Sequence, residues 1–269
     1  MIDTHCHLDV NDYEDIDLVI KNMNNNIMMA SGCNMQTNKR VIELVNKYNN
    51  IYGTIGIHPE EISNTLKEDL DFIEKNLKNP KIVGIGEIGL DYHWNKDNKE
   101  QQADVFIKQI ELAKRYNKPI VIHSREATLE TYNILRDNLG SIKATLHCYS
   151  STLDMAKRFL KLGVNFGVGG VLTFKNSLKL QEVVKGLELE NFMLETDSPY
   201  LTPEPFRGKK NEPYNIIYVA KKIAEIKDIP LEKVLEITTQ NAINQFDLKL
   251  WLCYNLYMYS AVFWGDLWI

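Results

Sequence analysis

Residues 81–123, KIVGIGEIGLDYHWNKDNKEQQADVFIKQIELAKRYNKPIVIH, contain the pattern that decides the fold. An apolar, β-rich run at 81–88 precedes a longer stretch at 100–116, and a second apolar run follows at 119–123. In the middle stretch, apolar residues recur at the spacing of one helix face: Ala103, Phe106, Ile107, Ile110 and Ala113. A strand, a helix and a second strand in this order predict a parallel βαβ unit.

The same alternation recurs along most of the chain. We expect strands near 2–7, 27–33, 51–57, 81–88, 119–123, 142–147, 163–168 and 191–196. We expect helices near 37–49, 67–77, 100–116, 126–138, 152–161, 178–186, 214–226 and 231–245. Repeated strand–helix units in a chain of 269 residues predict a single-domain α/β protein, a closed (β/α)₈ TIM barrel that spans residues 1–249. A doubly wound open sheet is the alternative.

The histidines indicate where the site lies. All six fall within or beside the end of a predicted strand: His5, His7, His58, His93, His123 and His147. Because side chains alternate along a strand, His5 and His7 point to the same side, into the mouth of the barrel, and Cys6 points toward the helices. With Glu87 and Asp197 at two further strand ends, this pattern predicts a metal site at the carboxyl face of the barrel.

Charge and cysteine content narrow the class of protein. The net charge of −5 argues against a broad basic surface that would grip duplex nucleic acid. The chain starts directly with an apolar strand pattern, so we expect no signal peptide. The four cysteines form no CxxC pair, which is typical of reduced thiols in a cytoplasmic protein.

Six segments resemble those of the TatD family of metal-dependent hydrolases, within the amidohydrolase-like barrel superfamily. They are DTHCHLD (3–9), GIHPE (56–60), GEIGLDYHW (86–94), PIVIHSREA (119–127), LHCYS (146–150) and ETDSPYLTPEPFRGKKNEP (195–213). They occur in the family's order, and the resemblance extends to about residue 247. It implies nuclease or phosphodiesterase chemistry and metal ligands at His5, His7, Glu87, His123, His147 and Asp197.

The ligand types indicate how such a site would work. Nitrogen and oxygen donors suit Zn²⁺, Mn²⁺ or Mg²⁺, and we expect two divalent ions. Glu87 is the candidate bridge because a carboxylate has two oxygens, and Asp197 is the candidate for orienting or deprotonating the attacking water. His58 and His93 each have two interpretations, since either ring could contact substrate or order the local turn.

Basic residues near the predicted mouth are candidates for binding phosphate groups. Arg125 follows His123 closely, and Arg207 and Lys209 lie in the proline-punctuated loop after the last strand. Four aromatic residues near the mouth could stack bases, although packing is the favoured role of each: Tyr92, Tyr149, Tyr200 and Phe206. We therefore expect a deoxyribonuclease that acts on strand ends or single strands, without an obligate protein partner.

Two other functions stay open. A hydrolase of amides, esters or lactones can use the same barrel, often with a carboxylated lysine between its metals. Here Glu87 occupies the corresponding strand and Lys81 lies at the wrong end of it. A non-enzymatic metal-binding or scaffold protein is the remaining alternative.

Residues 250–269, LWLCYNLYMYSAVFWGDLWI, fall outside the family pattern. This aromatic tail holds three of the four tryptophans and a single charge, at Asp266. Asn255, Ser260 and Asp266 interrupt the apolar run, so we expect no stable membrane association. The favoured interpretation is that the tail packs on the barrel or is a non-native extension, and an interfacial or partner-binding helix is the alternative.

Overall fold

The computed structural model describes residues 1–9, 11–94 and 96–249, and it contains the predicted barrel. Eight parallel strands pair in sequence order. They are β1 (Ile2–Cys6), β2 (Ile27–Ser31), β3 (Ile51–Ile55), β4 (Ile82–Asp91), β5 (Ile120–Arg125), β6 (Ala144–Leu146), β7 (Val164–Val168) and β8 (Phe192–Leu194). The last strand returns to the first: Asp197 N donates to His5 O at 2.9 Å, and His7 N donates to Ser198 O at 2.7 Å. These bonds exclude the open-sheet alternative.

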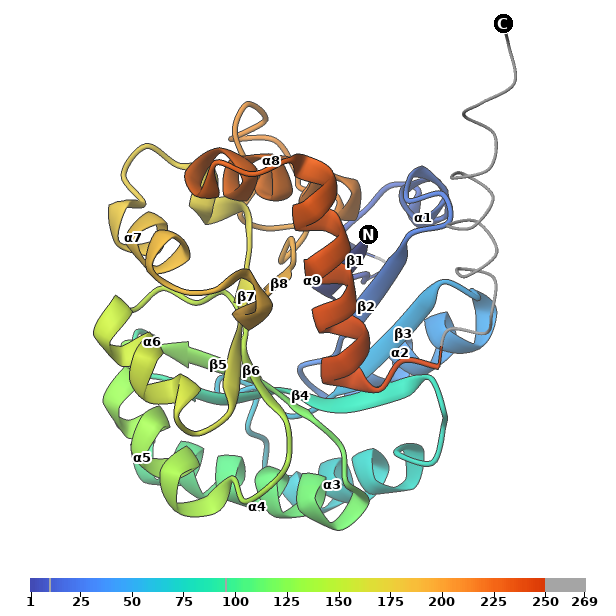
Figure 1. The fold of residues 1–269 in the computed structure, drawn as a ribbon. Coiled ribbons are helices and arrows are strands. Elements are labelled where there is room, and N and C mark those ends of the chain that lie inside the picture. Colours follow the sequence, from blue (N-terminus) through green and yellow to red (C-terminus); the bar gives the residue numbers. More distant parts are fainter. Residues whose placement is uncertain (10, 95, 250–269) are drawn as a thin grey trace, which may run out of the picture.

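Helices surround the strands on the outside (Figure 1). They are α1 (Ile16–Asn22), α2 (Met35–Lys47), α3 (Leu66–Asn76), α4 (Lys99–Tyr116), α5 (Thr128–Asn138), α6 (Leu153–Leu160), α7 (Leu178–Gly186), α8 (Ile216–Lys227) and α9 (Leu231–Phe246). Three short 3₁₀ turns lie at Gly170–Thr173, Leu189–Asn191 and Pro213–Asn215. Helix α1 was not predicted. It begins at the Asp15 cap, whose side chain accepts from Leu18 N, and it buries only Val19 and Ile20.

Several strand ends differ from the prediction. β6 and β8 are only three residues long and end at Leu146 and Leu194. Cys148 and Asp197, shortly after these ends, have φ angles of 46° and 54°, a left-handed conformation that is uncommon for residues other than glycine. The chain therefore leaves the sheet earlier than expected, and the ligand candidates after β6 and β8 lie on its edge.

The barrel interior has an apolar layer beneath a polar one. Val121 of β5 and Met193 of β8 belong to a buried cluster that Phe246 of α9 joins. Two residues after each of these stand His123, still in β5, and Glu195, directly after β8. Because alternate residues of a strand share a face, an inner wall that is apolar at its lower end becomes polar at the mouth.

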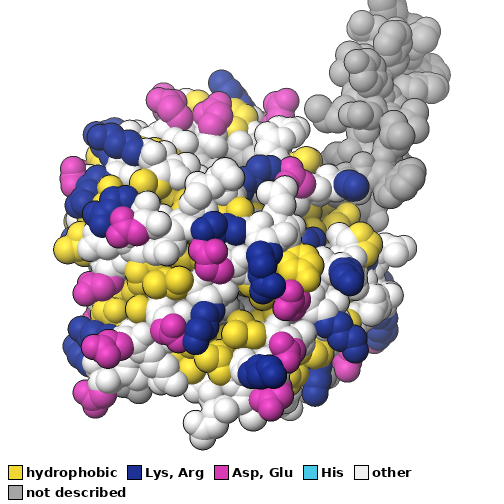
Figure 2. All heavy atoms as spheres, turned by 90° about the horizontal axis from the view of Figure 1, so that it is seen from below, with side chains coloured by type: hydrophobic (Ala, Val, Ile, Leu, Met, Phe, Trp, Pro, Cys, Tyr) yellow, Lys and Arg dark blue, Asp and Glu magenta, His cyan; other side chains and the backbone are white. Residues whose placement is uncertain are grey.

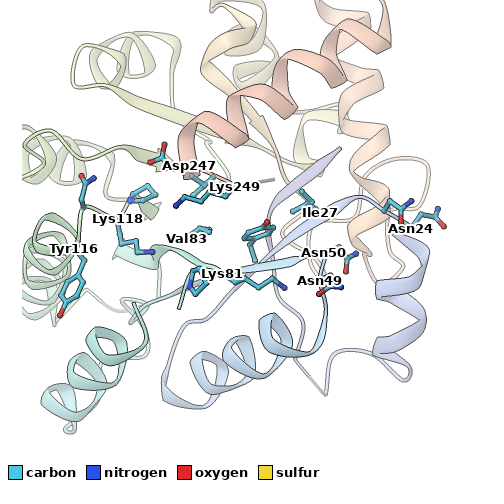
Figure 3. A pocket seen from close by; sticks show the side chains of 16 residues that line it. Asn24, Ile27, Asn49, Asn50, Lys81, Val83, Tyr116, Lys118, Asp247 and Lys249 are labelled. Atoms are coloured by element: carbon cyan, nitrogen blue, oxygen red, sulfur yellow. The ribbon is translucent and has the colours of Figure 1, made fainter. Parts of the chain in front are cut away.

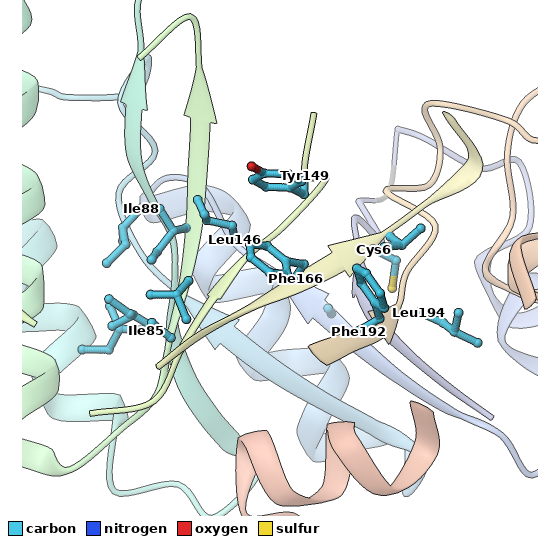
Figure 4. Close-up of a cluster of buried hydrophobic side chains, with 14 of the residues drawn as sticks. Cys6, Ile85, Ile88, Leu146, Tyr149, Phe166, Phe192 and Leu194 are labelled. Atoms are coloured by element: carbon cyan, nitrogen blue, oxygen red, sulfur yellow. The ribbon is translucent and has the colours of Figure 1, made fainter. Parts of the chain in front are cut away.

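A second, larger core fills the space between the strands and the helices (Figure 4). Leu146, Phe166 and Phe192 are register partners on β6, β7 and β8, and all three are buried. Cys6 belongs to this outer core, as predicted from its place between His5 and His7. The outer core thus fixes the strands whose other face carries the polar groups.

The surface of the barrel carries both signs of charge. Figure 2 shows Lys and Arg side chains interspersed with Asp and Glu over one face, with small apolar patches between them. Within the described part of the chain, no helix is long and apolar enough to cross a membrane. The expectations for the tail at 250–269 lie outside the described residues.

Candidate metal centre

The six predicted ligand residues meet at the carboxyl ends of the strands. They are His5 in β1, Glu87 in β4 and His123 in β5, together with His7, His147 and Asp197 just beyond β1, β6 and β8. Three overlapping groups each bring three donor atoms within 4.8 Å of one another: His5, His7 and Glu87; His5, His147 and Asp197; His58, Glu87 and His123. Residues far apart in the chain therefore form one compact set of nitrogen and oxygen donors.

The first cluster consists of His5, His7, Asp197 and Oε2 of Glu87. His5 Nε2 lies 3.4 Å from Glu87 Oε2 and 3.6 Å from Asp197 Oδ1. His7 Nε2 lies 3.8 Å and 3.3 Å from the same two oxygens. These separations exceed those of good hydrogen bonds. They match the spacing of two ligands on one ion, which is about 3.4 Å for bonds of about 2.1 Å at a tetrahedral angle.

His5 provides an independent test of whether a cation fits. Its Nε2 atom is buried, and among the described residues it has no hydrogen-bond partner. Burial lowers the pKa of His5 to about 4, so the ring is neutral at neutral pH. Its Nδ1 atom lies 3.1 Å from Ser31 Oγ. A buried, unpaired nitrogen that faces two carboxylates fits a metal ligand.

The second cluster consists of His58, His123, His147 and Oε1 of Glu87. Glu87 Oε1 lies 2.6 Å from His147 Nε2, 2.8 Å from His123 Nδ1 and 3.6 Å from His58 Nε2. On its far side, His123 Nε2 lies 2.9 Å from Asp91 Oδ2. Burial lowers the pKa of His123, but the hydrogen bonds to Asp91 and Glu87 outweigh burial and raise it to about 9. Both nitrogens of His123 therefore carry protons here, because an ionised carboxylate only accepts.

Glu87 stands between the two clusters. One of its oxygens faces each cluster, and the residue is 3% exposed. Burial raises its pKa, but the charges of His147 and His58 and the hydrogen bonds from His123 and His147 outweigh burial and hold the pKa well below its usual value. An ionised carboxylate with two differently directed oxygens has the geometry needed to contact two cations.

Neighbouring groups that were not predicted fix the orientation of the histidine rings. The carbonyl oxygen of Ser31 lies 3.2 Å from His7 Nδ1, and the hydroxyl of the same residue is within reach of His5. Asp91 plays the equivalent part for His123. In each ring the other nitrogen faces the cluster, which is how partners of metal-binding histidines set the tautomer.

Glu195 lies beneath His147. Its Oε1 accepts from the backbone N–H of Cys148 and is 4.0 Å from His147 Nδ1, and burial raises the pKa of Glu195 to about 8. A Cβ on Gly167 would lie 1.9 Å from Glu195 Oε2, so the carboxyl group needs a glycine at that position. A second acidic residue two positions before Asp197, directly after the apolar Phe192–Leu194, was the signal that could have revealed it.

His58 and His93, the two histidines with two interpretations, differ in burial and in contacts. His58 is buried and orders the turn, since Nδ1 accepts from Glu60 N at 3.2 Å, and its Nε2 lies 3.6 Å from Glu87 Oε1. Substrate contact by His58 stays a prediction. His93 is exposed and lies 2.7 Å from Glu126 Oε1 through its Nδ1. It therefore pairs with a surface carboxylate beside the mouth.

The predicted phosphate-binding residues are exposed but do not form one group. Arg125 ends β5, next to His123 along the rim, and its guanidinium lies 5.4 Å from the ring of Trp94. The guanidinium of Arg207 lies 4.1 Å from the Phe174 ring, and Lys209 Nζ lies 5.8 Å from the Phe206 ring. Arg207 and Lys209 therefore lie against the aromatic rings of Phe174 and Phe206. Arg125 lies two residues after His123, beside the second cluster.

Two of the four aromatic candidates have the packing role that was favoured for each of them. Tyr92 and Tyr149 are each 5% exposed and form part of the core, so neither ring can receive a base. Phe206 is half-buried against Tyr218, with ring centroids 5.1 Å apart. Tyr200 is exposed, and an exposed Trp94 was missed.

A cleft at the other end of the barrel has a different chemistry (Figure 3). Ile27 and Val83, at the start of β2 and β4, line its floor, and asparagine and lysine side chains surround them. Lys81 lines it as well and donates to Val45 O at 2.8 Å. Lys81 is thus far from Glu87, which agrees with its predicted position at the wrong end of the strand for a metal-bridging lysine.

Known proteins share this barrel along nearly its full length. A family model described as TatD related DNase matches residues 2–247. The chain is 39% identical over 254 residues to the uncharacterized metal-dependent hydrolase YabD of Bacillus subtilis, covering 93% of this chain and 100% of YabD. It is 36% identical over 264 residues to deoxyribonuclease TATDN3 of Homo sapiens, covering 91% and 94% of the two chains.

A solved structure agrees with the same fold. The crystal structure of YJJV, a TatD homolog from Escherichia coli K12, matches with a TM-score of 0.84 at 28% identity. The match covers 92% of this chain and 98% of that protein. The barrel fold is therefore shared with a solved TatD homolog over most of both chains.

Proposed function

This chain belongs to the TatD family of metal-dependent hydrolases, and on that premise we propose that it is a deoxyribonuclease that hydrolyses phosphodiester bonds at strand ends or in single strands. The observation that carries the proposal is the pair of donor clusters on the two oxygens of Glu87. Two cations held side by side are a recurring device for phosphodiester hydrolysis. The name of the human relative, a deoxyribonuclease, points to DNA as the substrate.

The donor set suits two divalent ions among Zn²⁺, Mn²⁺ and Mg²⁺. His5, His7 and Asp197 would hold one ion, His123 and His147 the other, and Glu87 both. When bound, such ions activate a water molecule and neutralise charge on the phosphate.

The chain's own residues supply the remaining steps. Asp197 orients the attacking water and accepts its proton, a role open to it because the neighbouring His7, His147 and His5 together outweigh burial and keep the pKa of Asp197 below its usual value. Arg125 and His58 bind the phosphate group beside the second cluster. Arg207 and Lys209 contact more distant phosphates of the strand.

The proposal also places the enzyme in the cytoplasm. Cys6, Cys33 and Cys148 are free thiols, as is usual in a reducing compartment.

Metal removal and a substrate panel test the proposal together. We expect EDTA to abolish hydrolysis and Mn²⁺, Mg²⁺ or Zn²⁺ to restore it. The restored enzyme should cleave single-stranded DNA faster than single-stranded RNA and faster than a panel of small amides, esters and lactones. Full activity in a verified metal-free preparation would exclude the metal mechanism, and faster cleavage of the amide or lactone panel would favour that alternative.

A further inference from the structure

Two large aromatic side chains project from the mouth of the barrel. Trp94 is 66% exposed and Tyr200 is 58% exposed. Trp94 lies three residues after β4, and Tyr200 lies six residues after β8. Both rings offer a large flat face beside the same polar centre, which is a surface that a ligand can use.

Short chains of contacts hold both rings in place relative to the donor clusters. The backbone N–H of Trp94 donates to Asp91 Oδ1 at 3.3 Å, and the other oxygen of Asp91 holds His123. The backbone N–H of Tyr200 donates to Asp197 O at 2.9 Å, and its ring centroid lies 6.1 Å from that of His7. Trp94 therefore adjoins the second cluster, and Tyr200 adjoins the first.

The strand order places the two rings on opposite sides of the mouth. The eight strands pair in sequence order and β8 returns to β1, so β4 and β8 are four strands apart in either direction round the barrel. A ligand that crosses the mouth from Trp94 to Tyr200 must pass over both clusters. The two clusters meet at Glu87.

The surroundings of Trp94 fit a nucleotide. The guanidinium of Arg125 lies 5.4 Å from the Trp94 ring and is itself exposed. An aromatic face beside a cation can receive a base and the adjoining phosphate. The bases of a duplex are already stacked on their neighbours, whereas those of a single strand are free to stack on protein rings.

On the basis of the proposed nuclease function, we propose that Trp94 and Tyr200 form a pair of base-stacking subsites on either side of the cleaved phosphodiester. Each ring takes one base of a single-stranded nucleic acid. The spacing between the rings then selects a substrate with at least two nucleotides, and the metal centre acts on the backbone between them.

The test compares a single-stranded trinucleotide with the same backbone made of abasic tetrahydrofuran nucleotides, using the full metal-loaded chain. We expect the wild-type protein to have a lower KM for the trinucleotide, by about 5-fold or more for each stacked base. Trp94→Ala and Tyr200→Ala should each remove part of that difference, and the double substitution should remove nearly all of it. Trp94→Phe should restore most of it, since phenylalanine keeps an aromatic face.

Tyr116→Ala is the matched control because Tyr116 lines the cleft at the opposite end of the barrel (Figure 3). It should keep the wild-type ratio of the two KM values. Equal KM values for the trinucleotide and the abasic chain in the wild-type protein would overturn the stacking proposal.

Binding separates this proposal from the proposed function. Fluorescence anisotropy of a labelled trinucleotide and its abasic analogue can be followed on metal-loaded Asp197→Asn, with and without Trp94→Ala. Base-dependent binding without any hydrolysis by the wild-type protein would support the stacking subsites and contradict the nuclease function. Hydrolysis without base-dependent binding would support the nuclease function and contradict the stacking subsites. If neither hydrolysis nor base-dependent binding is seen, both proposals are overturned.

Discussion

The first and second clusters share Glu87 but differ in how their nitrogen atoms are occupied. In the first cluster the donor atoms are 3.3 to 3.8 Å apart, and His5 Nε2 is unpaired among the described residues. In the second, His123 and His147 donate directly to Glu87 at 2.8 and 2.6 Å. Hydrogen bonds thus hold the donor atoms of the second cluster together. The donor atoms of the first cluster already have the spacing of ligands around one cation.

The groups that contact the outward-facing nitrogens of the histidine rings also differ between the two clusters. Ser31, a neutral residue, supports the histidines of the first cluster. Carboxyl groups support those of the second: Asp91 contacts His123, and Glu195 lies near His147. The pKa of Asp91 is lowered, so this anion makes the His123 imidazole more basic and strengthens both proton and metal binding there, whereas the raised pKa of Glu195, about 8, leaves it mostly protonated at neutral pH. Competition between protons and metal should therefore be stronger in the second cluster.

Glu87→Gln should have the largest effect because it disturbs both clusters at once. An amide offers one oxygen and no charge, so metal content measured by elemental analysis should fall at both sites and hydrolysis should fall to the metal-free background. Glu74→Gln, in a surface pair with Arg115, is the control and should behave as wild type. Retention of both metals in Glu87→Gln would show that the carboxylate does not bridge them.

Asp197→Asn should affect the first cluster alone. We expect turnover to fall by roughly 10²-fold or more, the scale of general acid–base catalysis, while the second cluster keeps its ion and the fold persists. Turnover, metal content and circular dichroism measure these three effects. A turnover equal to that of the wild type would remove Asp197 from the mechanism.

Asp91→Asn and Ser31→Ala compare the residue that contacts His123 in the second cluster with the residue that contacts His5 in the first. Loss of the carboxylate behind His123 should weaken metal binding at the second cluster by about 10- to 100-fold. Ser31→Ala should cost less, because the Ser31 carbonyl that holds His7 remains. Calorimetric titration of metal into each variant gives the two affinities, and a larger loss in Ser31→Ala would reverse the comparison.

The pH dependence of metal binding should also distinguish the clusters. The folded-state pKa of His123 is raised to about 9, so below that pH its ring holds a proton that a metal must displace. The pKa of His147 is raised too and that of His58 is lowered to about 4, so two histidines of the second cluster hold protons more tightly than usual. In the first cluster the pKa of His7 alone is raised, well above its usual value, and that of His5 is lowered. Affinity of the second cluster should rise with pH up to about 9, by about tenfold per pH unit for each proton released.

Calorimetric titrations of metal at pH 7, repeated in buffers of different ionisation enthalpy, measure how many protons each binding step releases. The ion that enters the second cluster should release more protons than the ion that enters the first. Equal proton release in two resolved steps would mean that the clusters do not differ in this respect.

Deletion of residues 250–269 should have the smallest effect. We propose that the catalytic domain ends at residue 249, since every ligand candidate precedes it. The truncated chain should keep specific phosphodiesterase activity and metal content near those of the full chain, and it should be more soluble. A lower unfolding temperature with loss of metal would show instead that the barrel needs the tail. Liposome co-sedimentation of the full chain alone would indicate a lipid anchor.

The sequence allowed the barrel and the strand-end donors to be predicted because both follow from periodicity. Val121 and His123 show this: alternation along one strand yields a core residue and then a donor. Helix α1 escaped prediction because it has two turns and only two buried residues. Ser31 also escaped, since a serine at a strand end has no feature that indicates a histidine partner.

Exposure beyond the strand ends was the least predictable property. Tyr92 and Trp94 are two residues apart in the same segment. The Tyr92 backbone still pairs with Arg125 O, which keeps its ring in the core, whereas Trp94 has left the sheet. The residue at which the strand ends thus decides which ring faces solvent. Sequence patterns do not predict that residue to within one or two positions.

The junction between β8 and β1 has a consequence for the order in which the site is made during translation. His5 and His7 leave the ribosome first, but Asp197 comes about 50 residues after His147, the last histidine of the second cluster. At ~5–20 residues per second, Asp197 follows several seconds later. A nascent chain therefore carries every histidine before it has the carboxylate that completes the first cluster. A ribosome-bound fragment ending shortly before Asp197 would lack both the water-activating group and the backbone bonds of Asp197 and Ser198 that close the barrel.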